Sequence, residues 1–400
     1  MIKLIFTFVN MKTFENTEIA FRSKNDADLN RAFWLFKIIG NPVIVKFGKW
    51  MTNFALSVKL PIDPIIKKTI FKQFCGGTTI QDCEHTIQQL SSYNIGTILD
   101  YSVEGKIKEE DFEKTTDEII ATIVRASKDT TIPYAVFKIT GIATFSLLEK
   151  ANSIENELTA NEKKSFASIA SRVDRICKSG FDCGIPVFID AEESWIQDTI
   201  DRLAQTMMAK YNIDKAIVFN TIQMYRHDRL DFLVKVIHDS QVNGYHYGIK
   251  LVRGAYMEKE RARATLMKYT SPIQPDKAAT DKDYNKALSL ILENFSNLSL
   301  CAGTHNEYSS ELLTDLLKKF NLQKDDKRIY FAQLLGMSDH ISFNLSSEGF
   351  NVAKYVPYGP IKEVLPYLLR RADENTSVAG QTSRELSLLA KEKARRKQNK

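Results

Sequence analysis

A segment near the C-terminal end carries two adjacent arginines, a glutamate and a tyrosine at helical spacing. Tyr367, Arg370, Arg371 and Glu374 recur at steps of three and four residues, so one side of a helix would present all four. Paired guanidinium groups bind carboxylates and phosphates through charge-assisted hydrogen bonds. The segment therefore predicts a receptor for a small anion, and the alternative interpretation is an exposed, salt-bridged helix face.

Hydrogen-bonding and charged residues also stand in or after the apolar runs that precede this segment. Leaving such groups buried and unpaired would cost on the order of several kcal/mol each, so they predict a ligand that satisfies them. Cations outnumber acids among them, which indicates an anionic ligand. Taken singly, each has a structural explanation, such as a helix cap for Asp190 or a core histidine for His305. The residues are Asp100, Lys138, Asp190, Gln223, Lys250, Arg253, Thr304, His305, Gln333 and Tyr355.

The elements that must position these residues follow a regular order. Eight short apolar runs alternate with helical segments, and near-continuous apolar strands are typical of a parallel sheet covered on both faces. Eight strand–helix units favour closure into a (βα)8 TIM-like barrel, whose functional side chains lie at the carboxyl ends of the strands. The alternative is an open doubly wound sheet, which usually brings a Gly-x-Gly-x-x-Gly loop that this sequence lacks. The runs are 97–102, 134–140, 186–190, 216–223, 247–254, 298–304, 328–334 and 352–356.

Before the first run the chain has the periodicity of helices. Residues 1–95 are therefore expected to form an N-terminal helical arm, residues 96–376 the barrel, and residues 377–400 a basic tail that is solvated and frayed. Large aromatic residues in a helical arm are more often core than function. The arm residues to which this expectation applies are Trp34, Phe36, Phe47, Trp50 and Phe54.

Whole-chain composition narrows the class of protein. The net charge of +6 over 400 residues is spread along the chain, so no nucleic-acid partner is expected. The five cysteines lack Cys-x-x-Cys spacing, and no cluster of histidines and carboxylates has metal-ligand spacing, so no metal site is expected. An odd cysteine count favours a reducing, cytoplasmic compartment. No uncharged apolar stretch approaches the ~18 residues of a membrane span.

Four of these motifs together resemble the motif set of the proline dehydrogenase family. They are Ile189-Asp190-Ala-Glu-Glu, Lys250-Leu-Val-Arg-Gly-Ala-Tyr, Gly-Thr304-His305-Asn and Tyr367-Leu-Leu-Arg-Arg-Ala-Asp-Glu-Asn, and they occur in the family's order. The resemblance implies a distorted (βα)8 barrel that holds FAD without a dinucleotide-binding fold. It also implies oxidation of L-proline to Δ1-pyrroline-5-carboxylate, with the electrons passed to a quinone.

The resemblance further assigns roles to individual positions. It implies catalytic positions at Asp190 and Lys250, although many members have an arginine where this chain has Lys250, and a lysine keeps the charge but loses the planar fork. Lys138, Arg370 and Arg371 would bind the substrate carboxylate, Leu334, Tyr355 and Tyr367 would wall the proline ring, and Glu374 would orient the arginines. The positions implied for FAD are Ala191, Gln223, Lys250, Arg253, Gly254, Ala255, Thr304 and His305.

Two other functions fit the same residues. One is a flavin enzyme of this fold that oxidises 4-hydroxyproline, which a tyrosine at position 355 disfavours because its ring would crowd the added hydroxyl. The other is a barrel that binds small acids without catalysis. A quinone acceptor would bring the protein to the inner face of a membrane. The candidate contact in the arm is the segment 47–50, Phe-Gly-Lys-Trp. The alternative is that the arm packs on the barrel.

Overall fold

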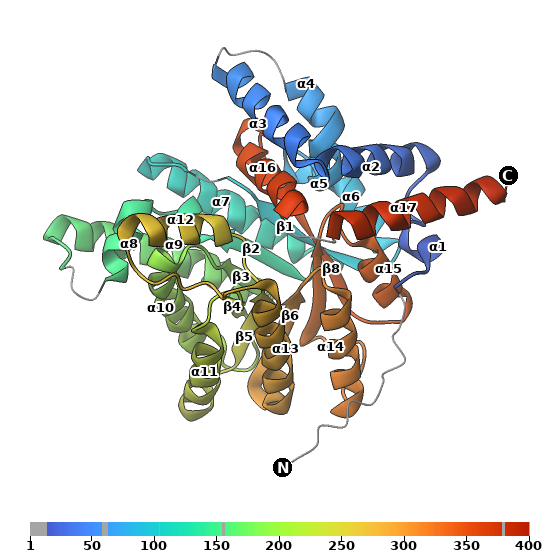
Figure 1. Cartoon of the computed structure of the whole chain (residues 1–400). Coiled ribbons are helices and arrows are strands. Elements are labelled where there is room, and N and C mark those ends of the chain that lie inside the picture. Colours follow the sequence, from blue (N-terminus) through green and yellow to red (C-terminus); the bar gives the residue numbers. More distant parts are fainter. Residues whose placement is uncertain (1–13, 58–62, 104, 154–156, 378–380, 400) are drawn as a thin grey trace.

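Eight parallel strands form a closed barrel in the computed structural model, which describes residues 14–57, 63–103, 105–153, 157–377 and 381–399. Each strand pairs with the next in sequence, and β8 pairs with β1. The predicted barrel is therefore confirmed (Figure 1). The strands are β1 (Ile95–Tyr101), β2 (Tyr134–Lys138), β3 (Val187–Asp190), β4 (Val218–Gln223), β5 (Tyr247–Val252), β6 (Leu298–Gly303), β7 (Ile329–Leu334) and β8 (Val352–Tyr358).

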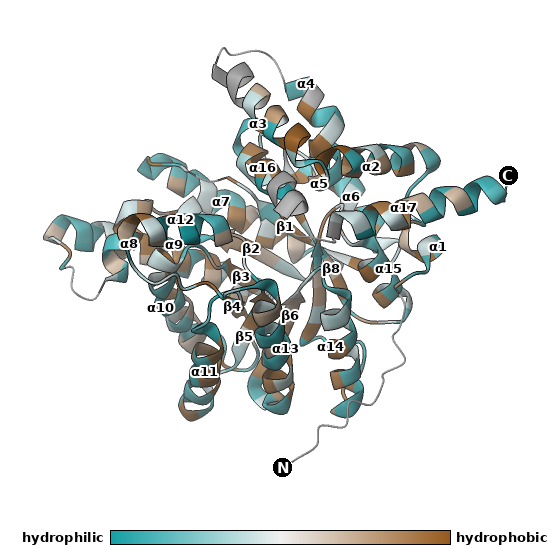
Figure 2. Cartoon of the chain, viewed as in Figure 1, coloured by the Kyte–Doolittle hydropathy of each residue, from teal (hydrophilic) through white to brown (hydrophobic). Residues whose placement is uncertain are grey.

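Helices surround this barrel and extend beyond it at one end. In Figure 2 hydrophilic residues gather on the surrounding helices, as expected for elements that bury one face against the sheet. The barrel helices are α6 (Ile80–Ser91), α7 (Glu109–Ala126), α8 (Phe145–Asn152), α9 (Ala160–Cys183), α10 (Ser194–Tyr211), α11 (Arg229–Asn243), α12 (Met257–Met267), α13 (Lys277–Glu293), α14 (Glu307–Lys319) and α15 (Asp339–Ser347). The remaining helices are α1 (Thr17–Ala20), α2 (Asp26–Ile39), α3 (Pro42–Ser57), α4 (Asp63–Ile66), a π-helical turn (Lys67–Phe71), α5 (Lys72–Phe74), α16 (Ile361–Ser377) and α17 (Gln381–Gln398).

Side chains alternate along each strand between the barrel interior and the layer under the helices. On β8, Ala353 and Tyr355 belong to the buried interior cluster, whereas Val352 and Val356 pack in the layer that the helices cover. The same alternation places Phe188 inside on β3. Asp190, two residues later, therefore also faces inward, toward the carboxyl end of the barrel.

Strand β8 is longer than the sequence suggested. It continues through Pro357 to Tyr358, so Tyr355 lies within the strand rather than at its end. Pro357 fits here because its carbonyl accepts a hydrogen bond from the N–H of Gly76, and the carbonyl of Tyr358 accepts one from Ser102. A proline has no N–H to donate to a neighbouring strand, so it fits where only its carbonyl is hydrogen-bonded. The predicted run 352–356 therefore ends two residues before the strand does.

A second hydrophobic core joins the N-terminal helices to α16 and α17 at one end of the barrel (Figure 1). It includes Phe36 of α2, Phe74 of α5, Leu368 of α16 and Leu388 of α17. Helix α16 follows β8 directly, so this core holds α16 in place above the carboxyl ends of the strands. The N-terminal arm thus supports the helix that carries the paired arginines.

The aromatic residues of the arm divide into two groups. Phe36 is buried, as expected, but Trp34, Phe47 and Trp50 are 55%, 58% and 61% exposed. The core-packing expectation was therefore wrong for these three residues, while the side chain of Phe54 lies outside the described part of the chain. The reason is geometric, because the second core takes only one face of each helix and leaves the opposite face to solvent.

The C-terminal segment is a helix and not a frayed tail. Helix α17 runs to Gln398 and buries Leu388, Leu389 and Glu392. The carboxylate of Glu392 accepts hydrogen bonds from Arg395 at 2.8 Å and from Arg396 at 2.8 Å. Arg395 and Arg396, which were expected to be solvated, thus pair with Glu392 one helical turn away.

Candidate active site

Three residues from three strands form a hydrogen-bonded network inside the barrel. The Lys250 Nζ lies 2.5 Å from Asp190 Oδ1 and 2.7 Å from the Tyr355 hydroxyl, and that hydroxyl donates to Asp190 Oδ1 over 3.0 Å. The ammonium group also lies 4.2 Å from the centroid of the Tyr355 ring. Burial, followed by the nearby carboxylate of Asp190, raises the pKa of Tyr355 well above its usual value, so the hydroxyl keeps its proton. The network is fixed and polar, and it faces the carboxyl end of the barrel.

Lys138 lies beside this network, across from Asp190 in the strand register. Its charge opposes the effect of burial on two further acids. Burial raises the pKa of Asp100, and it raises the pKa of Glu192 to about 7, while Lys138 and hydrogen bonds from Thr140 act in the opposite direction on Glu192. Lys138 is therefore a cation held among carboxyl groups at the barrel mouth.

Arg253 follows β5 and is held by groups from three elements. Its guanidinium donates to Asp281 over 2.7 Å, to the hydroxyl of Thr304 over 2.7 Å and to the hydroxyl of Ser309 over 2.8 Å. It also lies 4.3 Å from the centroid of the Tyr284 ring. These partners fix the planar group, which suits it for recognising an anionic oxygen.

The residues after Arg253 expose their backbone at the barrel mouth. Gly254 has φ +131°, and a Cβ at this position would lie 2.4 Å from a carbon of the Tyr225 ring. Glycine is therefore required, because a larger residue would meet both the strained backbone and the ring. Gly254 and Ala255 are both exposed, so the backbone is open to a ligand here, while Ala191 is buried at the end of β3.

His305 follows β6 and is fixed by a serine from the next unit. Its Nδ1 lies 2.9 Å from the hydroxyl oxygen of Ser338. Burial, and then the positive charges of Lys354 and Arg371, lowers the pKa of His305 to about 3. The ring is therefore neutral near pH 7 and can donate or accept a hydrogen bond without adding charge.

Helix α16 brings the predicted substrate residues toward the barrel mouth. The Arg371 guanidinium lies 5.2 Å from the centroid of the Tyr367 ring, and both side chains are buried. Leu334 packs against both the second core and the barrel interior, so it stands between Tyr367 and Tyr355. Arg370 is partly exposed beside them, and the side chain of Glu374 lies outside the described part of the chain.

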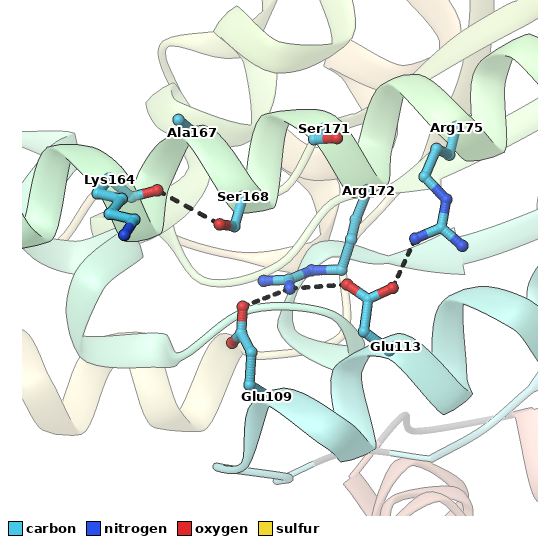
Figure 3. Close-up of a pocket in the computed structure, with 8 residues that line it drawn as sticks. All are labelled: Glu109, Glu113, Lys164, Ala167, Ser168, Ser171, Arg172 and Arg175. Atoms are coloured by element: carbon cyan, nitrogen blue, oxygen red, sulfur yellow. Dashed lines mark hydrogen bonds and ion pairs between the residues drawn. The ribbon is translucent and has the colours of Figure 1, made fainter.

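A groove on the outer wall of the barrel also contains two arginines, but here they are paired with glutamates (Figure 3). It lies between α7 and α9, where Arg172 donates to Glu109 over 2.6 Å and Arg175 lies 2.5 Å from a carboxylate oxygen of Glu113. The figure shows these arginines pointing at the glutamates of the facing helix. The groove is a salt-bridged helix contact, and its arginines are structural.

Comparisons with known proteins show the family of this chain. The family model described as "Proline dehydrogenase" matches residues 83–384. The chain belongs to the proline dehydrogenase family. This family is one of oxidoreductases and is generally flavin-dependent.

Individual relatives show how much of the chain is shared. "Proline dehydrogenase 1, mitochondrial" of Dictyostelium discoideum is 33% identical over 97% of this chain and 76% of that protein. The human protein of the same name is 39% identical over 60% of this chain, and the match spans 41% of its own length. The crystal structure of proline utilization A (PutA) from Bdellovibrio bacteriovorus inactivated by N-propargylglycine superimposes with a TM-score of 0.72 at 18% identity, covering 93% of this chain and 40% of that one. This chain thus spans less than half of the human relative and of the PutA chain.

The residues present fit the flavin that the family generally uses. Gln223 is the last residue of β4, and its buried amide Oε1 has no hydrogen-bond partner within the described residues. Leaving this oxygen unpaired costs free energy unless a ligand donates a hydrogen bond to it. Gly254 and Ala255 expose their backbone, and Arg253 and Thr304 offer charge and a hydroxyl beside it. These groups come from neighbouring strands, as a ligand lying across the barrel mouth would require.

Three buried polar residues near the site were not assigned a role from the sequence. Ser338 binds His305, and its N–H donates to Glu385 of α17. Lys354 is completely buried on β8 and pairs with Asp339 at 2.9 Å. Lys354 could have been identified from the sequence, because it is a lysine within an apolar strand. Glu385 could not, because the residues around it in the sequence are mostly polar and resemble a solvated tail.

Proposed function

We propose that this protein oxidises L-proline to Δ1-pyrroline-5-carboxylate with FAD as its resident cofactor. The observation that supports it best is the network of Asp190, Lys250 and Tyr355, which faces the arginine-bearing helix α16 in a chain of this family. A bound flavin supplies the acceptor for the hydride that leaves C5 of proline. The two electrons leave with that hydride, and loss of the N–H proton completes the imine.

The chain's own residues would hold the substrate for this step. Arg370, Arg371 and Lys138 bind the carboxylate, which fixes the acid end and directs C5 toward the cofactor side of the mouth. Tyr355, Leu334 and Tyr367 enclose the ring. Cations around the amine lower its pKa, so that the amine is neutral and its lone pair can form the C=N bond.

Lys250 and Asp190 would act on the electrostatics of the same step. Lys250 is 7% exposed, and its ammonium group stays in place through its bonds to Asp190 and Tyr355. A fixed positive charge at this depth stabilises the negative charge that the reduced cofactor carries. The cofactor contacts we propose are Ala191, Gln223, Lys250, Arg253, Gly254, Ala255, Thr304 and His305.

The cofactor assignment is tested on the purified protein. We expect a yellow protein whose flavin is FAD and is released into the supernatant on denaturation, because nothing in the site calls for a covalent link. A protein that stays colourless after incubation with FAD and gel filtration would contradict the proposal. Flavin retained in the denatured pellet would contradict non-covalent binding.

The preference for proline over trans-4-hydroxyproline is expected to depend on Tyr355. Its ring is buried and its hydroxyl is held by two partners, so it cannot swing away from an added 4-hydroxyl. We expect Tyr355→Ser to narrow the ratio of kcat/KM between the two substrates, and to weaken proline by roughly 1–3 kcal/mol through lost ring contacts. Steady-state kinetics with both substrates measure this, and an unchanged ratio would show that Tyr355 does not face the substrate. A wild-type enzyme that favoured hydroxyproline would support the alternative function.

We further propose that a quinone receives the electrons at a membrane surface contacted by α2 and α3. Seven large apolar side chains of these helices are exposed, and on α3 they recur at steps of three and four residues. The rings of Phe47 and Trp50 stack at 5.9 Å, and Lys37 lies 4.8 Å from the ring centroid of Trp34. An apolar helix face bordered by lysines fits the interface of an anionic membrane. The seven are Trp34, Ile38, Val43, Ile44, Phe47, Trp50 and Met51.

This surface contact differs from insertion across the bilayer. Within the described ranges, none of the helices has both the length and the apolar character that spanning a membrane requires. The relatives from Dictyostelium and human are named as mitochondrial proteins, whereas the sequence led us to expect a cytoplasmic location, and the compartment of this chain stays a prediction.

Binding to lipid vesicles is expected to depend on this face. The double variant Phe47→Ser, Trp50→Ser should bind anionic phospholipid vesicles about tenfold or more weakly, because two aromatic side chains no longer enter the interface. A matched control is Val234→Ser, Val242→Ser, which removes two apolar side chains exposed on the barrel helix α11. Co-sedimentation measures binding, and equal pelleting of wild type, variant and control would rule out this face as the contact.

A further inference from the structure

Helix α17 reaches the barrel mouth through one buried carboxylate. Glu385 lies near the start of α17 and is 2% exposed. Its Oε1 accepts a hydrogen bond from the backbone N–H of Ser338, the residue that precedes α15. The last helix of the chain is thus bonded to the segment that joins β7 to α15.

Ser338 needs this partner because of its backbone conformation. Its φ of +50° and ψ of +42° lie in the left-handed region, which costs a non-glycine residue on the order of 1 kcal/mol. The residue is completely buried, so its N–H would also lose its bond to water without a protein acceptor. Glu385 supplies that acceptor and therefore stabilises the conformation that Ser338 adopts.

That conformation places the hydroxyl of Ser338 on His305. The Oγ to Nδ1 distance is 2.9 Å, and this bond fixes the plane of the imidazole ring. Because Nδ1 is engaged, Nε2 is the ring nitrogen that can reach a ligand. His305 directly follows Thr304, whose hydroxyl accepts from Arg253. The hydrogen-bonded path from Glu385 of α17 through Ser338 thus ends at His305, one of the residues proposed to bind FAD.

We propose that Glu385 is a positioning residue for the cofactor site. Through Ser338 it holds His305 in the orientation in which the ring hydrogen-bonds to FAD. This inference rests on the proposed function, because it takes FAD as the ligand of His305. Helix α17 then contributes to the cofactor site by fixing the orientation of His305.

Other contacts keep α17 docked when Glu385 is replaced. Arg384 binds Glu307 of α14 through two bonds of 2.7 Å and 3.1 Å. Arg396 lies 3.0 Å from Asp26 of α2, and Leu388 and Leu389 are buried in the second core. A variant at Glu385 therefore removes the path to Ser338 without releasing the helix.

The test measures the affinity of the full-length apoprotein for FAD by quenching of flavin fluorescence. We expect Glu385→Leu to weaken binding about tenfold or more, the usual size of one lost hydrogen bond to a charged ligand. Glu385→Gln should keep nearly wild-type affinity, because its amide oxygen still accepts from the N–H of Ser338. Ser338→Gly should weaken binding like Glu385→Leu, because glycine adopts the same backbone but lacks the hydroxyl.

A double variant and a matched control separate positioning from general stability. Glu385→Leu combined with Ser338→Gly should bind FAD no more weakly than Ser338→Gly alone, since both changes interrupt one path. Glu392→Leu replaces another buried glutamate of α17, which accepts hydrogen bonds from Arg395 and Arg396 of its own helix and from Thr17 of α1. This variant should lower Tm without changing FAD affinity.

The outcomes are distinguishable. Wild-type affinity in Ser338→Gly, or additive losses in the double variant, would overturn the inference while leaving the proposed function intact. The same holds if Glu392→Leu weakens FAD binding as much as Glu385→Leu, because the effect would then be general stability. A wild-type protein that does not bind FAD would overturn both.

Discussion

Replacing Arg370 or Arg371 with methionine is expected to raise the KM for L-proline steeply and to leave FAD content close to that of wild type. Each change removes charge-assisted hydrogen bonds to the substrate carboxylate, on the order of 2–4 kcal/mol once the unpaired carboxylate is counted, which corresponds to roughly 30- to 1,000-fold. Arg371 should show the larger effect, because it is buried against Tyr367, whereas Arg370 is partly exposed.

The matched control is Arg328→Met. Arg328 stands just before β7, at the opposite end of the barrel, and pairs with Asp326 at 2.7 Å. This variant should keep the wild-type KM. Steady-state kinetics at saturating acceptor measure the constant, and the flavin-to-protein ratio confirms that the site is loaded. A wild-type KM in both Arg370→Met and Arg371→Met would mean that the arginine pair is an exposed salt-bridged face and not the substrate receptor.

The second large effect is expected at Arg253, where alanine should abolish FAD retention. The guanidinium bonds to Asp281, Thr304 and Ser309, so its removal takes away a fixed positive group and leaves Asp281 without this partner. The Arg253–Asp281 pair is only partly buried, with side chains 21% and 24% exposed. Losing a hydrogen bond to a charged ligand group costs about 1.5–3 kcal/mol, which corresponds to a loss of FAD affinity of at least about tenfold.

A buried arginine outside the site serves as the control for Arg253. Arg172, on the outer wall of the barrel, is also ion-paired and buried (Figure 3). Arg172→Ala should lower Tm, yet keep the wild-type flavin-to-protein ratio. Flavin absorbance after gel filtration measures retention. If Arg253→Ala retained FAD at the wild-type ratio, Arg253 would be a structural residue and the cofactor would have to lie elsewhere on the barrel mouth.

Much of the fold could be predicted because the strands are buried on both faces. Runs such as that of Phe188 and Ile189 are apolar throughout, and the first polar residue after them, Asp190, marks the carboxyl end. Where a strand continues past a polar or cyclic residue, this signal fails. The expected end of β8 was wrong for this reason, since Pro357 lies within the strand and contributes only its carbonyl.

The site was predictable only as far as its residues stand in or next to strands. Lys250 and Tyr355 could be identified as polar residues in apolar runs, but nothing in the spacing shows that they bond to each other and to Asp190. That contact depends on the stagger of strands that are not neighbours in sequence.

Contacts from distant segments left no sequence signal. Glu385 reaches Ser338 across 47 residues, and nothing in either local sequence pairs the two. For Phe47 and Trp50 the sequence left both core packing and a membrane contact open, because aromatic residues at helical spacing usually pack in a core, and the structure exposes both. Which face of a helix is covered depends on neighbours that the local pattern does not specify.

The central claim is tested most directly by adding L-proline to the purified, FAD-loaded protein in the absence of oxygen. We expect that the visible flavin absorbance bleaches, that one Δ1-pyrroline-5-carboxylate forms per flavin reduced, and that a quinone restores the colour. A flavin spectrum that saturating L-proline leaves unchanged would contradict it.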